Sequence, residues 1–85
     1  MNKHERLLEH ILTKRGDANV PFAALCELLR LLGFEERIKG DHHIFTMSGL
    51  EEIINVQAKH GKAKPYQVKQ IRDLVLRYDL KIGER

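Results

Sequence analysis

The sequence of 85 residues contains one cysteine, two prolines, no tryptophan and only 6% aromatic residues. A single cysteine excludes an internal disulfide and argues against a cysteine-based zinc site. The apolar neighbours of Cys26 predict a buried, unreactive thiol. The sequence also lacks any apolar run near the roughly 18–20 residues that a membrane-spanning helix needs. Its first residues are rich in Lys, His and Glu and do not form a signal peptide, so we expect a cytoplasmic protein without a membrane partner.

Acidic residues are absent between Glu52 and Asp73, a stretch that carries five basic residues. Residues 34–56 carry two basic and five acidic side chains, whereas residues 57–85 carry eight basic and three acidic ones. This local excess of positive charge suits a polyanion such as nucleic acid, because each phosphate contact adds affinity. On charge alone, a solvated surface that serves solubility explains the pattern equally well. The candidate RNA contacts are Lys39, Lys59, Lys62, Lys64, Lys69 and Arg72.

Length and hydrophobic periodicity predict a single domain of the α+β class. Apolar residues recur at helical spacing over residues 3–15, and Gly16 ends this helix. A second helix begins near Pro21 and ends at Gly33, while a third begins at Lys64-Pro65 and continues to about Tyr78. We expect residues 1–20 to form an N-terminal helical extension to residues 21–85, within one compact domain.

Between the second and third helices the hydrophobic period changes to that of β-strands. Three short strands are predicted over residues 34–39, 42–47 and 51–56, with tight turns at Gly40-Asp41 and Ser48-Gly49. The order α-α-β-β-β-α predicts a three-stranded antiparallel sheet with helices packed on one face.

His42 and His43 are adjacent on the second predicted strand, so their side chains point to opposite faces of the sheet. His43 shares its face with Phe45, and His42 shares the other face with Ile44; the pattern does not say which row is buried. The exposed histidine could act as a general acid or base near neutral pH. Because RNA carries its own nucleophile, the 2′-hydroxyl, one histidine and a few cations suffice for cleavage. A strand with one core and one surface histidine explains a bare pair more simply.

Several motifs occur in a fixed order along the chain: Gly33-Phe34, Arg37, Lys39-Gly40-Asp41-His42-His43-Ile44-Phe45, and Lys64-Pro65-Tyr66-Gln67-Val68 followed by Ile71. Together they resemble the HicA (YcfA-like) family of small bacterial toxins over about residues 21–80. The resemblance implies a fold like that of a double-stranded-RNA-binding domain (dsRBD) and ribosome-independent cleavage of mRNA. It also implies a partner, a HicB-like antitoxin that covers the active site.

The family motif reads Gly-Ser-His-His or Gly-Ser-Asn-His, and its last position, which is His in both versions, carries the activity. The resemblance therefore implies that His43 is catalytic, with His42, Gly40 and Asp41 in supporting roles. Asp41 departs from the usual serine. Its carboxylate suits a turn because it can accept hydrogen bonds from backbone N–H groups, but its charge repels phosphate.

The remaining candidates each have two interpretations. His60 is an ordinary loop histidine or a catalytic partner, and Tyr66 stacks on a base or packs on the sheet. His4 and His10 do not share a helix face well, and with one cysteine and no acidic–histidine cluster in the sequence we predict no metal and no cofactor. The main hypothesis is a metal-independent mRNA endoribonuclease in which His43 transfers protons. The alternatives are a non-catalytic RNA-binding module and a protein-interaction domain.

Overall fold

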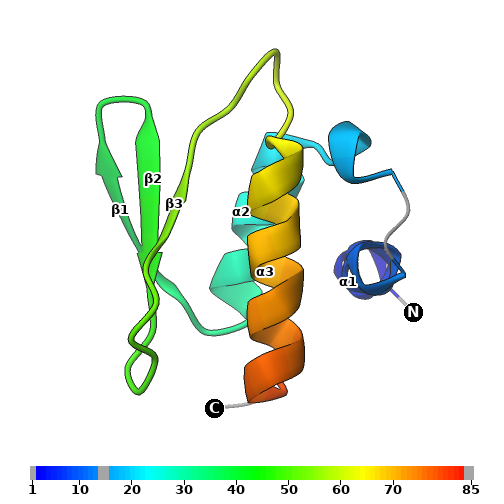
Figure 1. Cartoon of the computed structure of the whole chain (residues 1–85), viewed down its shortest axis with the longest axis vertical. Coiled ribbons are helices and arrows are strands. Elements are labelled where there is room, and N and C mark those ends of the chain that lie inside the picture. The colour runs from blue at the N-terminus through cyan, green and yellow to red at the C-terminus, as the bar shows by residue number, and fades with distance from the viewer. Residues whose placement is uncertain (1, 14–15, 84–85) are drawn as a thin grey trace.

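The computed structural model describes residues 2–13 and 16–83. Its elements are α1 (Lys3–Leu12), the 3-10 turn η1 (Asp17–Asn19), α2 (Phe22–Leu31), β1 (Glu35–Lys39), β2 (His42–Thr46), β3 (Ile54–Val56) and α3 (Pro65–Tyr78). The predicted α+β order is confirmed. Figure 1 shows three layers, with the sheet on one side, α2 and α3 in the middle and α1 beyond them. Among the described residues, no helix is long and apolar enough to cross a membrane.

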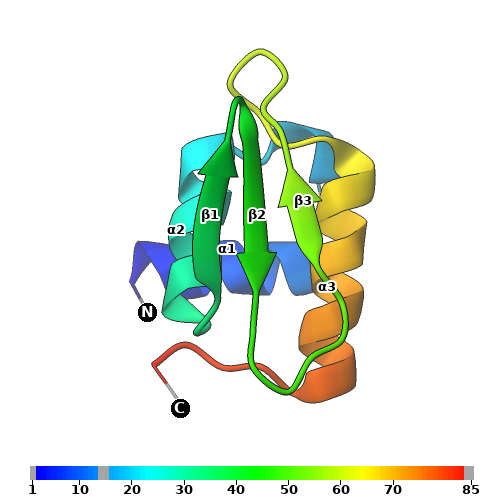
Figure 2. The same ribbon diagram turned by 90° about the vertical axis from the view of Figure 1, so that its left-hand side faces the viewer.

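The three strands form an antiparallel sheet in the order β1-β2-β3. Lys39 pairs with His42 across the two-residue turn, and His43 pairs with Val56 on β3. Gly40 takes a φ of +62°, a left-handed conformation that glycine adopts without a Cβ clash. Helices α2 and α3 lie behind the sheet in Figure 2, and within the described ranges no element covers its front face.

The ends of the central helices follow from the residues that stand there. Gly33 has a φ of +105°, and its N–H donates to the Arg30 carbonyl while the Phe34 N–H donates to the Leu29 carbonyl. These two bonds form the Schellman motif that typically ends a helix at glycine. Pro65 opens α3, where its missing N–H leaves no helical hydrogen bond unmade.

The hydrophobic core lies between the sheet and helices α2 and α3. Phe45 is fully buried in it, so the His43 row of β2 faces the helices and the His42 row faces outward. Ile11 of α1 is also fully buried, so the predicted N-terminal extension contributes to the same core. The buried apolar residues are Ile11, Val20, Leu25, Cys26, Leu28, Leu29, Leu32, Phe34, Phe45, Ile54, Val56, Ala63, Val68, Ile71, Leu74 and Val75.

The third strand is shorter than the sequence predicts. A strand over residues 51–56 was expected, but β3 begins only at Ile54, so the prediction was wrong for residues 51–53. The Glu52 carboxylate accepts hydrogen bonds from the Tyr78 hydroxyl at 2.8 Å and from Arg77 Nη1 at 2.6 Å. These contacts hold the segment before β3 against the end of α3, away from the sheet ladder.

Candidate functional site

His43 lies on the helix-facing side of β2, at the border of the core. Its side chain keeps 22% of its exposure. The imidazole meets the Phe22 ring edge-on, with the ring centroids 4.9 Å apart. Because Phe22 opens α2, the first turn of this helix and strand β2 fix the imidazole from two sides.

A carboxylate holds the His43 ring in one orientation. His43 Nδ1 lies 2.6 Å from Glu36 Oε2, while Arg30 donates to Oε1 from Nε at 2.8 Å and pairs with it through Nη2 at 2.7 Å. Burial raises the pKa of Glu36, but the hydrogen bonds from His43 and Arg30 outweigh burial and lower this pKa overall. The ionised carboxylate can only accept, so this contact favours the tautomer in which Nδ1 carries the proton and Nε2 holds the lone pair.

Cys26 is the third polar group at this position. One ligand atom from each of Cys26, Glu36 and His43 lies within 4.8 Å of the other two. Burial, followed by the nearby Glu36 charge, raises the pKa of the Cys26 thiol to about 11. At neutral pH the thiol therefore stays protonated, and the predicted burial of Cys26 is confirmed.

His42 occupies a different environment on the open face of the sheet. Its Nδ1 lies 3.0 Å from Asn55 Oδ1, and its Nε2 lies 3.8 Å from Asp41 Oδ1. Gln57 donates to the other Asp41 oxygen at 2.6 Å, and this hydrogen bond is the main cause that lowers the pKa of Asp41. The turn carboxylate thus contacts His42 and Gln57, whereas the carboxylate bonded to His43 is Glu36.

Three of the six predicted RNA contacts gather on the loop before α3. Lys59, Lys62 and Lys64 line one cavity of about 330 Å³, together with Ala18, His60, Ala63 and Pro65. This loop is bound to the start of α2, since the Phe22 N–H donates to the Gly61 carbonyl at 3.0 Å. Because the Phe22 ring also touches His43, the basic loop and the histidine are joined through one residue.

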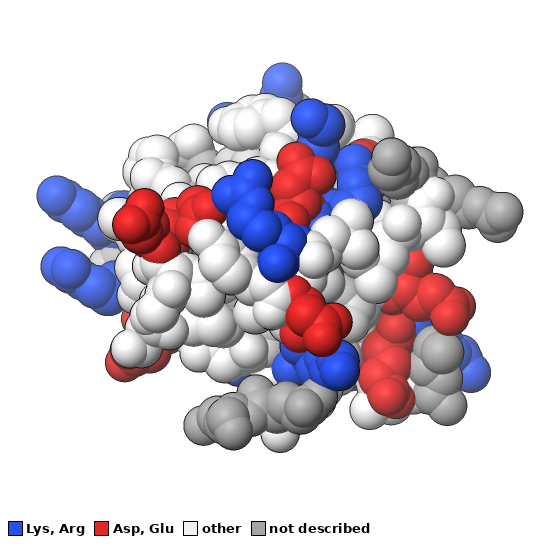
Figure 3. All heavy atoms as spheres, turned by 60° about the horizontal axis from the view of Figure 1, so that its bottom comes forward, with Lys and Arg blue, Asp and Glu red and all other residues white. Residues whose placement is uncertain are grey.

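Two other predicted contacts lie elsewhere. Lys39 ends β1 opposite His42. Lys69 lies on α3 and lines a separate cavity of about 350 Å³ with Glu52 and Asp73 among its walls. On the face shown in Figure 3, acidic and basic side chains are interspersed, so no broad positive field covers that face.

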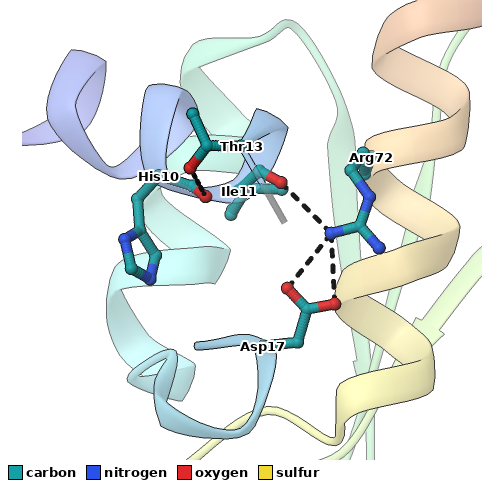
Figure 4. A network of polar contacts seen from close by, with 5 residues as sticks. All are labelled: His10, Ile11, Thr13, Asp17 and Arg72. Carbon is teal, nitrogen blue, oxygen red and sulfur yellow. Dashed lines mark hydrogen bonds and ion pairs between the residues drawn. The ribbon is translucent and has the colours of Figure 1, made fainter. Parts of the chain in front are cut away.

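The prediction for Arg72 was wrong, because this side chain lies in the protein interior. Only 5% of Arg72 is exposed. Its Nη1 donates to the Ile11 carbonyl and to both carboxylate oxygens of Asp17, each at 3.1 Å (Figure 4). The guanidinium therefore ties α1 and η1 to α3 and is not available to a phosphate group.

Sequence reasoning missed Glu36, Phe22 and Asn55 as partners of the two histidines. The alternation along β1 does place Glu36 on one side with Phe34 and Ile38, but only the β1–β2 register brings that side next to His43. No family model, no curated protein and no solved structure matches this chain.

Proposed function

We propose that this protein is a HicA-like endoribonuclease that cleaves mRNA without a metal cofactor and acts in the cytoplasm as the toxin of a toxin–antitoxin pair. One observation carries the proposal: the 2.6 Å hydrogen bond between Glu36 and His43 Nδ1 leaves the lone pair on Nε2. A carboxylate that fixes the tautomer of a histidine is the arrangement that general-base catalysis uses. The motif resemblance supplies the substrate class and the antitoxin partner.

In the proposed reaction, His43 Nε2 removes the proton from a ribose 2′-hydroxyl. The 2′-oxygen forms a bond to the adjacent phosphorus, and the bond from phosphorus to the 5′-oxygen breaks. The products are a 2′,3′-cyclic phosphate and a 5′-hydroxyl, whose oxygen takes its proton from water. Glu36 is a positioning residue, because its negative charge stabilises the imidazolium that forms on His43.

The basic loop supplies the binding part of this proposal. Lys59 and Lys62 are exposed, and Lys64 is half-buried at the start of α3. Their positive charges suit the RNA backbone and the charge that develops on phosphorus during the reaction.

The experiment is cleavage of an end-labelled mRNA by the wild type, His43→Ala and His42→Ala, each with EDTA present. We expect His43→Ala to lose about 100-fold or more in cleavage rate, since general-base catalysis contributes about 10²–10⁴-fold. His42→Ala, the matched control on the opposite face, keeps most of the activity. Glu36→Gln lowers kcat and leaves KM unchanged, because the amide still accepts from Nδ1 but carries no charge.

Three outcomes contradict parts of the proposal. Loss of cleavage in His42→Ala but not in His43→Ala moves the catalytic position by one residue. Salt-sensitive RNA binding without cleavage identifies a non-catalytic RNA-binding module. Absence of RNA binding even at low salt favours the remaining alternative, a protein-interaction domain.

A further inference from the structure

Cys26, Glu36 and His43 form a cluster that includes a thiol, a group that general acid–base catalysis by His43 does not need. The three side chains come from α2, β1 and β2, and their potential ligand atoms lie within 4.8 Å of one another. Catalysis as proposed above uses the carboxylate and the imidazole and assigns no task to the thiol. A sulfur, a nitrogen and a carboxylate oxygen gathered at one point are the ligands that Zn²⁺ takes in proteins, and Mg²⁺ and Ca²⁺ prefer oxygen alone.

The spacing of the three ligand atoms is close to that of a tetrahedral zinc site. Zn–S bonds of about 2.3 Å and Zn–N or Zn–O bonds of about 2.0 Å put neighbouring ligand atoms about 3.3–3.6 Å apart. Here His43 Nδ1 and Glu36 Oε2 are 2.6 Å apart, and one ligand atom from each of the three side chains lies within 4.8 Å of the other two. Side-chain shifts of about 1 Å therefore convert one arrangement into the other, with the ion in place of the shared proton.

The surroundings of the cluster also suit a bound ion. Arg30 holds Glu36 through Oε1, so Oε2 is directed toward His43 and the ion binds one carboxylate oxygen. Hydrogen-bonded outer partners of this kind orient metal ligands. The partial exposure of His43 lets a water molecule complete the fourth position.

We propose that Cys26, Glu36 and His43 bind one Zn²⁺ ion, and that this ion switches off the His43 base. The switch rests on the proposed function, whereas the binding does not. Coordination through Nδ1 shifts the ring proton from Nδ1 to Nε2, and the Cys26 thiol releases its proton to water as it binds the ion. Nε2, the atom that has to accept a proton from the 2′-hydroxyl, is then already protonated. Zinc-bound and cleavage-competent forms of the protein are therefore mutually exclusive.

Metal binding is tested first, on the full chain and without RNA. Titration with Zn²⁺ by calorimetry is expected to show one site, and Co²⁺ as a substitute is expected to give a thiolate-to-metal absorption band. Cys26→Ala abolishes the band, and Cys26→Ala and Glu36→Gln each weaken Zn²⁺ binding by about 100-fold, since even outer-partner changes cost 10–100-fold. His60→Ala, in the exposed loop, is the matched control and binds as the wild type does. Circular dichroism checks that every variant is folded.

Inhibition is tested second, with the mRNA cleavage assay. Wild-type cleavage is expected to fall at least about tenfold when Zn²⁺ reaches one equivalent, and EDTA restores it. Cys26→Ala cleaves at the wild-type rate in EDTA and keeps this rate when the same amount of Zn²⁺ is added.

The two tests fail separately. Zinc binding by Cys26→Ala with the wild-type affinity, or a wild-type cobalt complex without the thiolate band, overturns the metal site whatever the cleavage assay shows. One zinc ion bound with the predicted variant pattern, in a protein that never cleaves RNA, supports the metal site and refutes the proposed function. Full cleavage by the zinc-loaded wild type overturns the switch.

Discussion

Arg72→Met offers the sharpest test of how this small domain is held together. Methionine keeps the apolar stem of the side chain but removes the guanidinium, which contacts the Ile11 carbonyl and the Asp17 carboxylate. The substitution therefore removes a charged donor from the buried Ile11 carbonyl and separates η1 from α3. Arg72 had been predicted to bind RNA, so the same variant also tests that correction.

The size of the effect follows from these contacts. Losing the charged hydrogen bond to the Ile11 carbonyl costs about 1.5–3 kcal/mol. Losing the pair with Asp17 adds about 1 kcal/mol, less than the 3–5 kcal/mol typical of fully buried pairs, because Asp17 is only partly buried and recovers some hydration. We expect a loss of about 3 kcal/mol from a total that for 85 residues is about 4–13 kcal/mol. At 4–8 °C per kcal/mol, Tm falls by about 12–24 °C.

Urea unfolding followed by circular dichroism measures this loss, and Lys69→Met on the exposed face of α3 is the matched control. Asp17→Asn should cost less in the Arg72→Met background than in the wild type, because the partner of Asp17 is already gone. A change below about 1 kcal/mol, or one no larger than that of Lys69→Met, refutes the clamp between α1, η1 and α3. An Arg72→Met variant that keeps the wild-type stability and lowers the salt dependence of RNA binding also refutes the interior role of Arg72.

Three further predictions follow from the site. Replacing Lys59, Lys62 and Lys64 by Gln should reduce the slope of log binding constant against log salt by about 2 for single-stranded RNA, whereas Lys69→Gln leaves the slope unchanged. The pKa of Glu36 lies below its ordinary value of 4.5 in the folded protein. The stabilisation that the Glu36 carboxylate provides is therefore complete above pH 4.5 and is lost as pH falls through the lowered pKa. In Glu36→Gln the free energy of unfolding should fall less steeply with decreasing pH than in the wild type. Asp41→Asn should strengthen RNA binding at low salt without changing the cleavage rate of bound RNA, because Asp41 is exposed and contacts Gln57 and His42.

Local chemistry made much of this fold predictable. Gly33 and Pro65 stand at helix ends because their backbone preferences fit there, and the strand turn at Gly40-Asp41 needs only two residues with the right conformations. The error at residues 51–53 has a non-local cause, since Glu52 is held by Tyr78, which lies 26 residues further along the chain. The same limit explains Arg72, whose partner Asp17 is 55 residues away.

The two carboxylates near the histidines show why the site itself was only half predictable. Asp41 is next to His42 in sequence, and proximity along the chain favours its carboxylate as the one beside the catalytic position. In the folded chain, strand alternation directs His42 and His43 to opposite faces, and Asp41 contacts the outward one. Antiparallel register then brings Glu36, seven residues earlier, to 2.6 Å from His43. The pairing of β1 with β2 therefore determines that Glu36 is the carboxylate that contacts His43. The same strand geometry leaves Asp41, the sequence neighbour, in contact with His42.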